Sequence, residues 1–89
     1  MFVSVIHRIS DPDEFWSIAE KATANIPADL KLPQFVTSEG LATTICLWEA
    51  PSVERLKAFL EPLLARVSKN EYLAITTERS SGLPAQVTT

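Results

Sequence analysis

The chain contains one histidine, one cysteine and one tyrosine, and these side chains limit the chemistry that it could perform. His7 is the only side chain whose ordinary pKa lies near neutrality, so any acid–base proposal begins with it. Glu71 and Tyr72 are its predicted neighbours, because antiparallel pairing of the first and last strands brings the end of one beside the start of the other. Such a pair could orient a ligand or move a proton. A hydrogen-bonded, structural histidine is the alternative.

Metal binding needs several nitrogen, oxygen or sulfur ligands that converge on one point. His7 and Cys46 are predicted to lie at different heights in the sheet, so they do not share an ion within one protomer. His7 with Glu71, at a seam between two protomers, is the remaining metal candidate. The sequence has no Gly-rich phosphate loop, no HExxH or CxxC pattern and no Ser-His-Asp order, and no cofactor is predicted.

Aromatic side chains are the second candidate group. Trp48 and Tyr72, with Trp16 and Phe59, could line an apolar pocket, and the alternative is that they belong to the core or to an interface. Cys46 lies within an apolar segment and is predicted to be a small buried hydrophobe. A solvated helix face without a functional role is predicted for four charged residues, Glu54, Arg55, Lys57 and Glu61.

Six elements are predicted to position these residues. Helical spacing of apolar residues, β-branched segments and turn residues predict strands over 2–9, 34–38, 41–49 and 71–77, and helices over 12–24 and 52–67. Asp11 and Pro12 form a helix start, and Glu39-Gly40 is a turn candidate. Pro62 predicts a kink near residues 58–59 or a restart at Glu61.

This order of elements predicts a ferredoxin-like βαββαβ fold of the α+β class. Right-handed crossovers give an antiparallel sheet with the strand order 4-1-3-2 and place both helices on one face. Residues 1–79 are predicted to form a single domain. Residues 80–89, which contain few apolar side chains, are predicted to be a flexible tail.

Alternation along the strands predicts which side chains share a face of the sheet. Leu41, Ile45, Leu47, Leu73 and Ile75 are the predicted helix-facing set. The opposite set contains Cys46, Trp48 and Tyr72, and it is too apolar to face water. A second copy of the chain is the predicted cover, so the sequence predicts a homodimer that pairs through the uncovered sheet face.

Composition excludes several classes of protein. The 89 residues are 46% hydrophobic with a net charge of −3, which argues against disorder, nucleic-acid binding and an anionic membrane surface. The first residues do not form a signal peptide, and no segment approaches the about 20 apolar residues of a membrane span. These features predict a cytoplasmic protein without a membrane partner.

The chain also resembles a known superfamily. Residues 1–79 resemble the dimeric α+β barrels, and residues 46–53 (CLWEAPSV) are similar to the matching stretch of small uncharacterised bacterial proteins related to a nickel-binding, stress-associated branch. In that branch the first strand ends in adjacent histidines, whereas this chain has His7 followed by Arg8, so only His7 carries over. The superfamily also includes heme-degrading and cofactor-free monooxygenases, decarboxylases and domains without known activity.

The residues and the resemblance together predict a homodimeric accessory protein that is stress-associated or binds a small apolar molecule. The ligand would lie in a cavity between the sheets, beside Trp48, Cys46, Tyr72 and Glu71. One alternative is a cofactor-independent monooxygenase or isomerase that uses His7 and Tyr72. The second alternative is binding of a nickel-like transition metal through His7.

Overall fold

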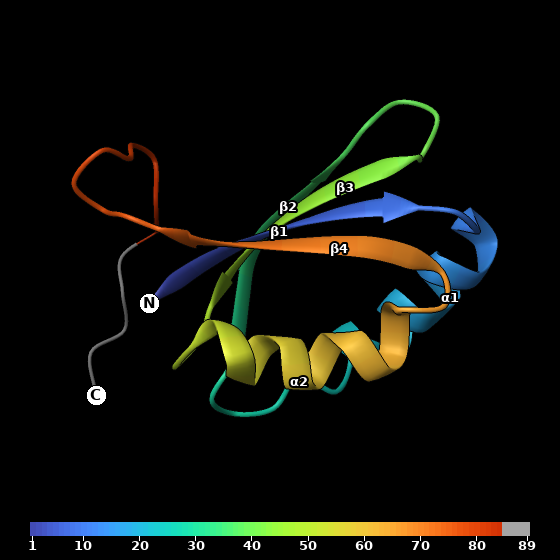
Figure 1. The fold of residues 1–89 in the computed structure, drawn as a ribbon, viewed down its shortest axis with the longest axis horizontal. Coiled ribbons are helices and arrows are strands. Elements are labelled where there is room, and N and C mark those ends of the chain that lie inside the picture. The colour runs from blue at the N-terminus through green and yellow to red at the C-terminus, as the bar shows by residue number, and fades with distance from the viewer. Residues whose placement is uncertain (85–89) are drawn as a thin grey trace.

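The computed structural model describes residues 1–84 and shows the predicted succession of elements (Figure 1). They are β1 (Phe2–Ile9), α1 (Pro12–Thr23), β2 (Lys31–Thr37), β3 (Thr43–Glu49), α2 (Val53–Leu64) and β4 (Ser68–Ile75). Every pairing is antiparallel, and the sheet order β2-β3-β1-β4 is the predicted order 4-1-3-2. The predicted ferredoxin-like α+β fold is therefore confirmed. No helix within residues 1–84 is long and apolar enough to cross a membrane.

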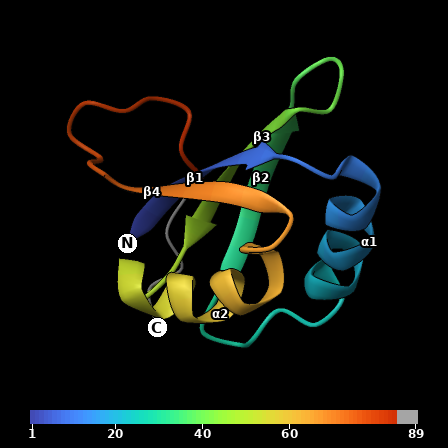
Figure 2. The same ribbon diagram turned by 45° about the vertical axis from the view of Figure 1, so that its right-hand side comes forward.

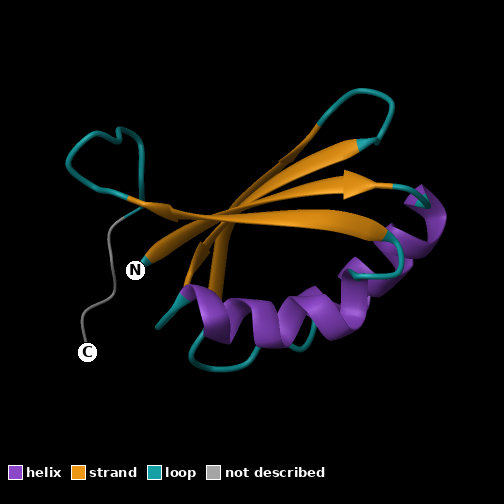
Figure 3. Ribbon diagram, in the orientation of Figure 1, coloured by secondary structure: helices purple, strands orange, loops and turns teal. Residues whose placement is uncertain are grey.

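The molecule has two layers, with both helices on one side of the sheet (Figures 1 and 3). α2 runs beneath the sheet and packs against β4. α1 stands toward one end of the sheet, on the side of β2 (Figure 2). The other face of the sheet carries no helix. This face is called the open sheet face below.

Both helices begin at capping residues. Asp11 accepts a hydrogen bond at 3.2 Å from the backbone N–H of Glu14, and Pro12 is the first helical residue, as predicted. α2 continues through Pro62 and ends at Leu64, so the predicted restart at residue 61 and helix end at residue 67 are wrong. The proline lies in the last turn, where the loss of one N–H interrupts little of the helix.

Two strands begin three residues earlier than predicted. β4 begins at Ser68 because residues 68–70 pair with the end of β1, although their polar side chains are typical of a helix end. β2 begins at Lys31 and contains Pro33, which lies at an irregularity of the register. An edge strand tolerates the missing N–H of proline. The earlier start of β4 places Asn70 directly opposite His7.

The β2–β3 hairpin contains the predicted glycine turn. Gly40 has a φ of +85°, a conformation that glycine adopts without steric cost. Leu41 follows with a φ of +64°. β3 therefore begins at Thr43 instead of residue 41, and Leu41 is an exposed turn residue instead of a helix-facing one.

The prediction of which residues face the helices is wrong. The register places Val3 opposite Trp48, and Val5 opposite Cys46 and Tyr72, so these side chains share a face. That face belongs to the core, which also includes Phe15, Leu56 and Leu60. The set predicted to face the helices lies instead on the open sheet face, apart from Leu41. Both sets are apolar, so hydrophobicity alone did not distinguish them.

The chain beyond β4 forms a loop over residues 76–84. This loop rises on the side of the sheet away from the helices (Figure 1). Ser80, Ser81 and Leu83 line a hollow together with Leu47 and Ile75 of the open sheet face. Of the predicted flexible tail, residues 85–89 lie outside the described part of the chain.

Candidate functional site

A hydrogen-bonded network begins at His7, which lies on the helix-covered side of the sheet and is 2% exposed. Its Nδ1 lies 2.6 Å from Oδ1 of Asn70. The amide orientation is determined by Nδ2 of Asn70, which donates to Oε2 of Glu61 at 2.7 Å. Oδ1 of Asn70 must then accept, so Nδ1 of His7 carries the hydrogen. The hydroxyl of Ser68 lies 2.7 Å from the same Oδ1.

Glu61 is the centre of this network. Its Oε2 accepts a second hydrogen bond, from the hydroxyl of Tyr72 at 2.9 Å, and the ammonium group of Lys57 lies 5.3 Å from the centre of the tyrosine ring. Burial raises the pKa of Tyr72, and the hydrogen bond to Glu61 raises it further. Glu61 was predicted to lie on a solvated helix face, but its side chain is partly buried and hydrogen-bonded to Asn70 and Tyr72. The network consists of His7, Ser68, Asn70, Glu61 and Tyr72.

Burial, and not the network, favours the neutral form of His7. Burial lowers the pKa of His7, and the hydrogen bond to Asn70 and the charge of Glu61 oppose this shift only in part. The tyrosine proton is held by a carboxylate at the other end of the network. The cavities described below do not have His7 or Tyr72 in their linings. This arrangement orders the junction of β1, β4 and α2, and it offers no proton donor or acceptor to those cavities.

Glu71 does not join this network. Its carboxylate pairs at 3.2 Å with Arg8, and both side chains are about half exposed. The predicted contact with His7 is wrong because adjacent residues of a strand point to opposite faces, and Asn70 and Tyr72 occupy the face of His7. Within residues 1–84 there is also no group of three or more His, Cys, Asp or Glu side chains that could hold a metal ion.

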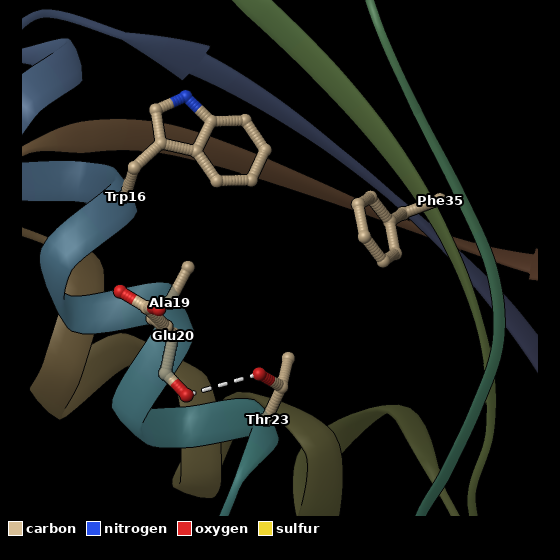
Figure 4. A pocket seen from close by; sticks show the side chains of 5 residues that line it. All are labelled: Trp16, Ala19, Glu20, Thr23 and Phe35. Carbon is tan, nitrogen blue, oxygen red and sulfur yellow. Dashed lines mark hydrogen bonds between the residues drawn. The ribbon is translucent and has the colours of Figure 1, made fainter.

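An apolar cleft lies between α1 and β2 (Figure 4). Its outer part has a volume of about 420 Å³ and is lined by Trp16, Ala19, Glu20, Thr23 and Phe35. Trp16 on α1 and Phe35 on β2 form opposite walls, with ring centres 6.4 Å apart. The cleft exists because β2 is an edge strand and α1 stands at the end of the sheet, so no helix covers this part of β2.

A smaller inner cavity of about 50 Å³ continues this cleft, because the two share Trp16, Ala19, Thr23 and Phe35. Its lining includes Cys46, Trp48, Leu60 and Leu64 from the core. Burial raises the pKa of Cys46 to about 12, so its thiol is protonated and behaves as an apolar group. The two cavities are called the outer cleft and the inner cleft below.

Two polar atoms beside the cleft lack hydrogen bonds. The Nε1 atoms of Trp16 and Trp48 are buried, and neither has a partner within residues 1–84. Such orphaned buried donors are uncommon in folded proteins. Both tryptophans line the inner cleft.

Phe15 separates the cleft from the network. Its ring centre lies 5.4 Å from that of His7 and 5.1 Å from that of Trp16. Of the predicted site residues, Cys46 and Trp48 therefore meet in the cleft, while His7 and Tyr72 meet in the network. The sequence prediction omitted Asn70 because it placed this residue at the end of the second helix. It omitted Phe35 because it did not predict that α1 stands at the end of the sheet, opposite β2.

The chain was compared with protein-family models, curated proteins and solved structures, and none of them matches. The fold and the site define the class of protein: a ferredoxin-like α+β domain with an apolar, aromatic-walled cleft and a separate buried polar network.

Proposed function

We propose that this protein binds a small, neutral, apolar molecule in the cleft between α1 and β2. The observation that carries the proposal is the outer cleft itself, whose volume of about 420 Å³ lies within the usual range for ligand sites. Glu20 is the one charged residue in the linings of its two parts. A charged ligand would therefore lose its hydration without gaining an ion pair deep in the cleft.

Exposure of the cleft walls also supports a ligand. Phe35 is 51% exposed although it lies on the helix-facing side of the sheet, opposite Trp16. An aromatic ring of this size contributes a large apolar area, and its removal from water is favourable. A molecule seated against the two rings in the outer cleft would bury the exposed part of Phe35.

Fluorescence of the neutral dye N-phenyl-1-naphthylamine tests this proposal. We expect saturable enhancement with the unmodified protein and at least about tenfold weaker binding to the variant Ala19→Leu, which places a larger side chain in the outer cleft. Ala58→Leu is the matched control, because Ala58 is an exposed residue of the other helix, and we expect unchanged binding. Equal affinity of the two variants, both folded by circular dichroism, would contradict cleft binding.

We propose that a second copy of the chain covers the open sheet face. Val36, Ile45 and Leu73 are between 43% and 54% exposed there, and Ile6, Leu47 and Ile75 lie on the same face. Four strands of about seven residues present roughly 400 Å², about half of what one partner usually contributes to a stable interface. The loops 38–42 and 76–84, which rise on this side, would supply the remainder (Figure 1). A ligand in the cleft would then lie outside the seam between the sheets.

Sedimentation velocity at micromolar concentration tests the dimer. We expect a dimer for the unmodified chain and a monomer for Ile45→Glu, because the substitution buries an unpaired charge in an apolar seam. Ala58→Glu, on the helix side, should remain dimeric. A soluble monomer of the unmodified protein would refute the pairing and leave the cleft proposal intact.

No observation favours the other predicted functions. His7 and Tyr72 are engaged with Asn70 and Glu61 and do not line the cleft, so an isomerase or monooxygenase site is not proposed. Metal binding through His7 gains no support from its amide partner. The stress-associated role and the cytoplasmic location stay predictions.

A further inference from the structure

We infer that the free edge of β2 binds an extended peptide, which pairs antiparallel with Phe35 and Thr37 and places one apolar side chain in the outer cleft. This inference rests on the proposed function in one respect, because that side chain would occupy the site proposed for an apolar molecule. It adds an independent observation, which is a row of outward-facing backbone groups at the edge of the sheet beside the cleft.

The pairing of β2 with β3 determines which backbone groups of β2 face outward. The N–H of Ser38 donates to the carbonyl oxygen of Thr43 at 2.8 Å. In an antiparallel pair, alternate residues of a strand bond to the partner strand, so Val36 also bonds to β3 while Phe35 and Thr37 do not. β2 is the end of the sheet, and no other strand within residues 1–84 lies beyond it. The N–H and C=O groups of Phe35 and Thr37 therefore point away from the sheet.

Part of this edge lacks the usual protection against strand addition. Edge strands are commonly protected by charged residues, prolines and irregularities of the register. The start of β2 has Lys31 and Pro33 at an irregular register, and the other edge strand, β4, contains Lys69 and Glu71. Residues 34–37 (QFVT) are exposed and contain neither a charge nor a proline. A further strand can therefore add at this segment.

The same register directs a peptide side chain into the outer cleft. Directly opposed residues of an antiparallel pair have their side chains on the same face. A peptide residue opposite Phe35 would therefore point toward the helices, where Trp16 and Ala19 line the cleft (Figure 4). The volume of about 420 Å³ has room for a leucine side chain, and Glu20 is the one charged residue of the lining, so an uncharged side chain fits.

A single extended segment suits this edge better than a second copy of the chain. The four residues 34–37 span about 14 Å, which is too short for the about 800 Å² that each partner of a stable complex usually contributes. Two copies joined through β2 would also bring both α1 helices to the same side of the seam, where one α1 already stands (Figure 2). An extended segment needs only the edge and the cleft.

The peptide acetyl-KTVLVTK-amide tests this inference, with its central leucine intended for the cleft and its lysines for solubility. The N–H of this leucine would donate to the carbonyl oxygen of Phe35, whereas the N–H of the preceding valine would point away from β2. We expect N-methylation of the leucine to weaken binding at least about tenfold in an NMR titration. N-methylation of the preceding valine is the matched control and should leave the affinity unchanged.

Variants of Thr37 test the protein side of the same pairing. Thr37→Pro removes an outward-facing N–H at an edge position, where proline is tolerated, and Thr37→Val retains it. We expect at least about tenfold weaker peptide binding to the first variant only, and unchanged dye binding to both, because Thr37 does not line the cleft. If Thr37→Pro does not fold, amide exchange decides: the peptide should slow exchange at Phe35 and Thr37 of the unmodified protein.

The outcomes separate this inference from the proposed function. Equal affinity of the two N-methylated peptides, or peptide binding that Ala19→Leu does not weaken, would overturn the inference. Binding of N-phenyl-1-naphthylamine without binding of the peptide would also overturn it and leave the proposed function intact. Peptide binding to a protein that does not bind the dye would support the strand pairing and contradict the small-molecule proposal. Slow exchange at Phe35 and Thr37 without peptide would show that a second copy covers the edge instead.

Discussion

Replacing Glu61 by glutamine should lower the free energy of unfolding by about 1–2 kcal/mol. The carboxylate accepts hydrogen bonds from Asn70 at 2.7 Å and from Tyr72 at 2.9 Å. Hydrogen bonds to a charged acceptor contribute about 1.5–3 kcal/mol each, and neutral ones about 0.5–1.5 kcal/mol. Glutamine makes both bonds neutral. Glu61 is partly exposed, so water compensates some of the lost hydrogen-bond energy. The expected loss of about 1–2 kcal/mol therefore lies toward the lower end of what these hydrogen-bond energies allow.

Urea denaturation followed by circular dichroism measures this change. Glu54→Gln is the matched control, because Glu54 is an exposed residue of the first turn of the same helix and makes only the weak dipole interaction expected there. We expect a loss of at most about 0.5 kcal/mol for this control. Equal effects of the two substitutions would refute the central role of Glu61 and restore the interpretation of a solvated helix face.

A second measurement distinguishes a charge effect from a change of packing. The charge of Glu61 raises the pKa of His7, against the larger lowering by burial. Removal of that charge in Glu61→Gln should therefore lower the pKa of His7 further in an NMR titration. An unchanged or raised pKa of His7 would show that the two side chains are not coupled through space.

Three other predictions follow from burial and backbone conformation. Burial lowers the pKa of His7 below its ordinary value of 6.5, so the unfolded chain takes up the proton first as the pH falls. The free energy of unfolding should therefore decrease below about pH 6.5, by at most about 1.4 kcal/mol per pH unit. Denaturation between about pH 5 and 7 should show this slope in the unmodified protein and not in His7→Gln. The thiol of Cys46, with its pKa raised to about 12, should resist Ellman's reagent at about pH 8 until urea unfolds the chain, and rapid labelling of the folded protein would contradict its burial. Gly40→Ala should lower the free energy of unfolding by about 1 kcal/mol, because alanine adopts the φ of +85° found at Gly40 only with steric strain. Thermal unfolding measures this change, and an unchanged melting temperature would show that the turn relaxes.

The sequence predicted the order of elements well because the strongest signals are local. The bounds of β1 are as predicted, and α1 differs by one residue at its end, since Asp11 and Pro12 define its start. β4 was placed too late because residues 68–70 have no intrinsic strand signal. Pairing with β1 makes them a strand, and such pairing cannot be read from the segment itself.

The candidate site was less predictable for two physical reasons. Alternation separates the residues of a strand into two sets, but it identifies the core set only when the other set is polar. Here Cys46 and Trp48 alternate with Ile45 and Leu47, so both sets are apolar. Glu61 was misassigned because it lies at the edge of the buried face of α2, directly after Leu60. From this position its carboxylate reaches Asn70.

β3 contributes to both proposed surfaces. Its residues Cys46 and Trp48 line the inner cleft, and the alternating residues Ile45 and Leu47 lie on the open sheet face. One layer of backbone would therefore separate a ligand in the proposed cleft site from the proposed partner on the open sheet face. Side chains of each surface can be replaced without touching the other. The two proposed surfaces would account for the run of apolar side chains from Ile45 to Trp48 in the centre of this strand. A sheet covered by helices on one face and by water on the other would need polar residues at the alternate positions, and β3 lacks them over its central residues.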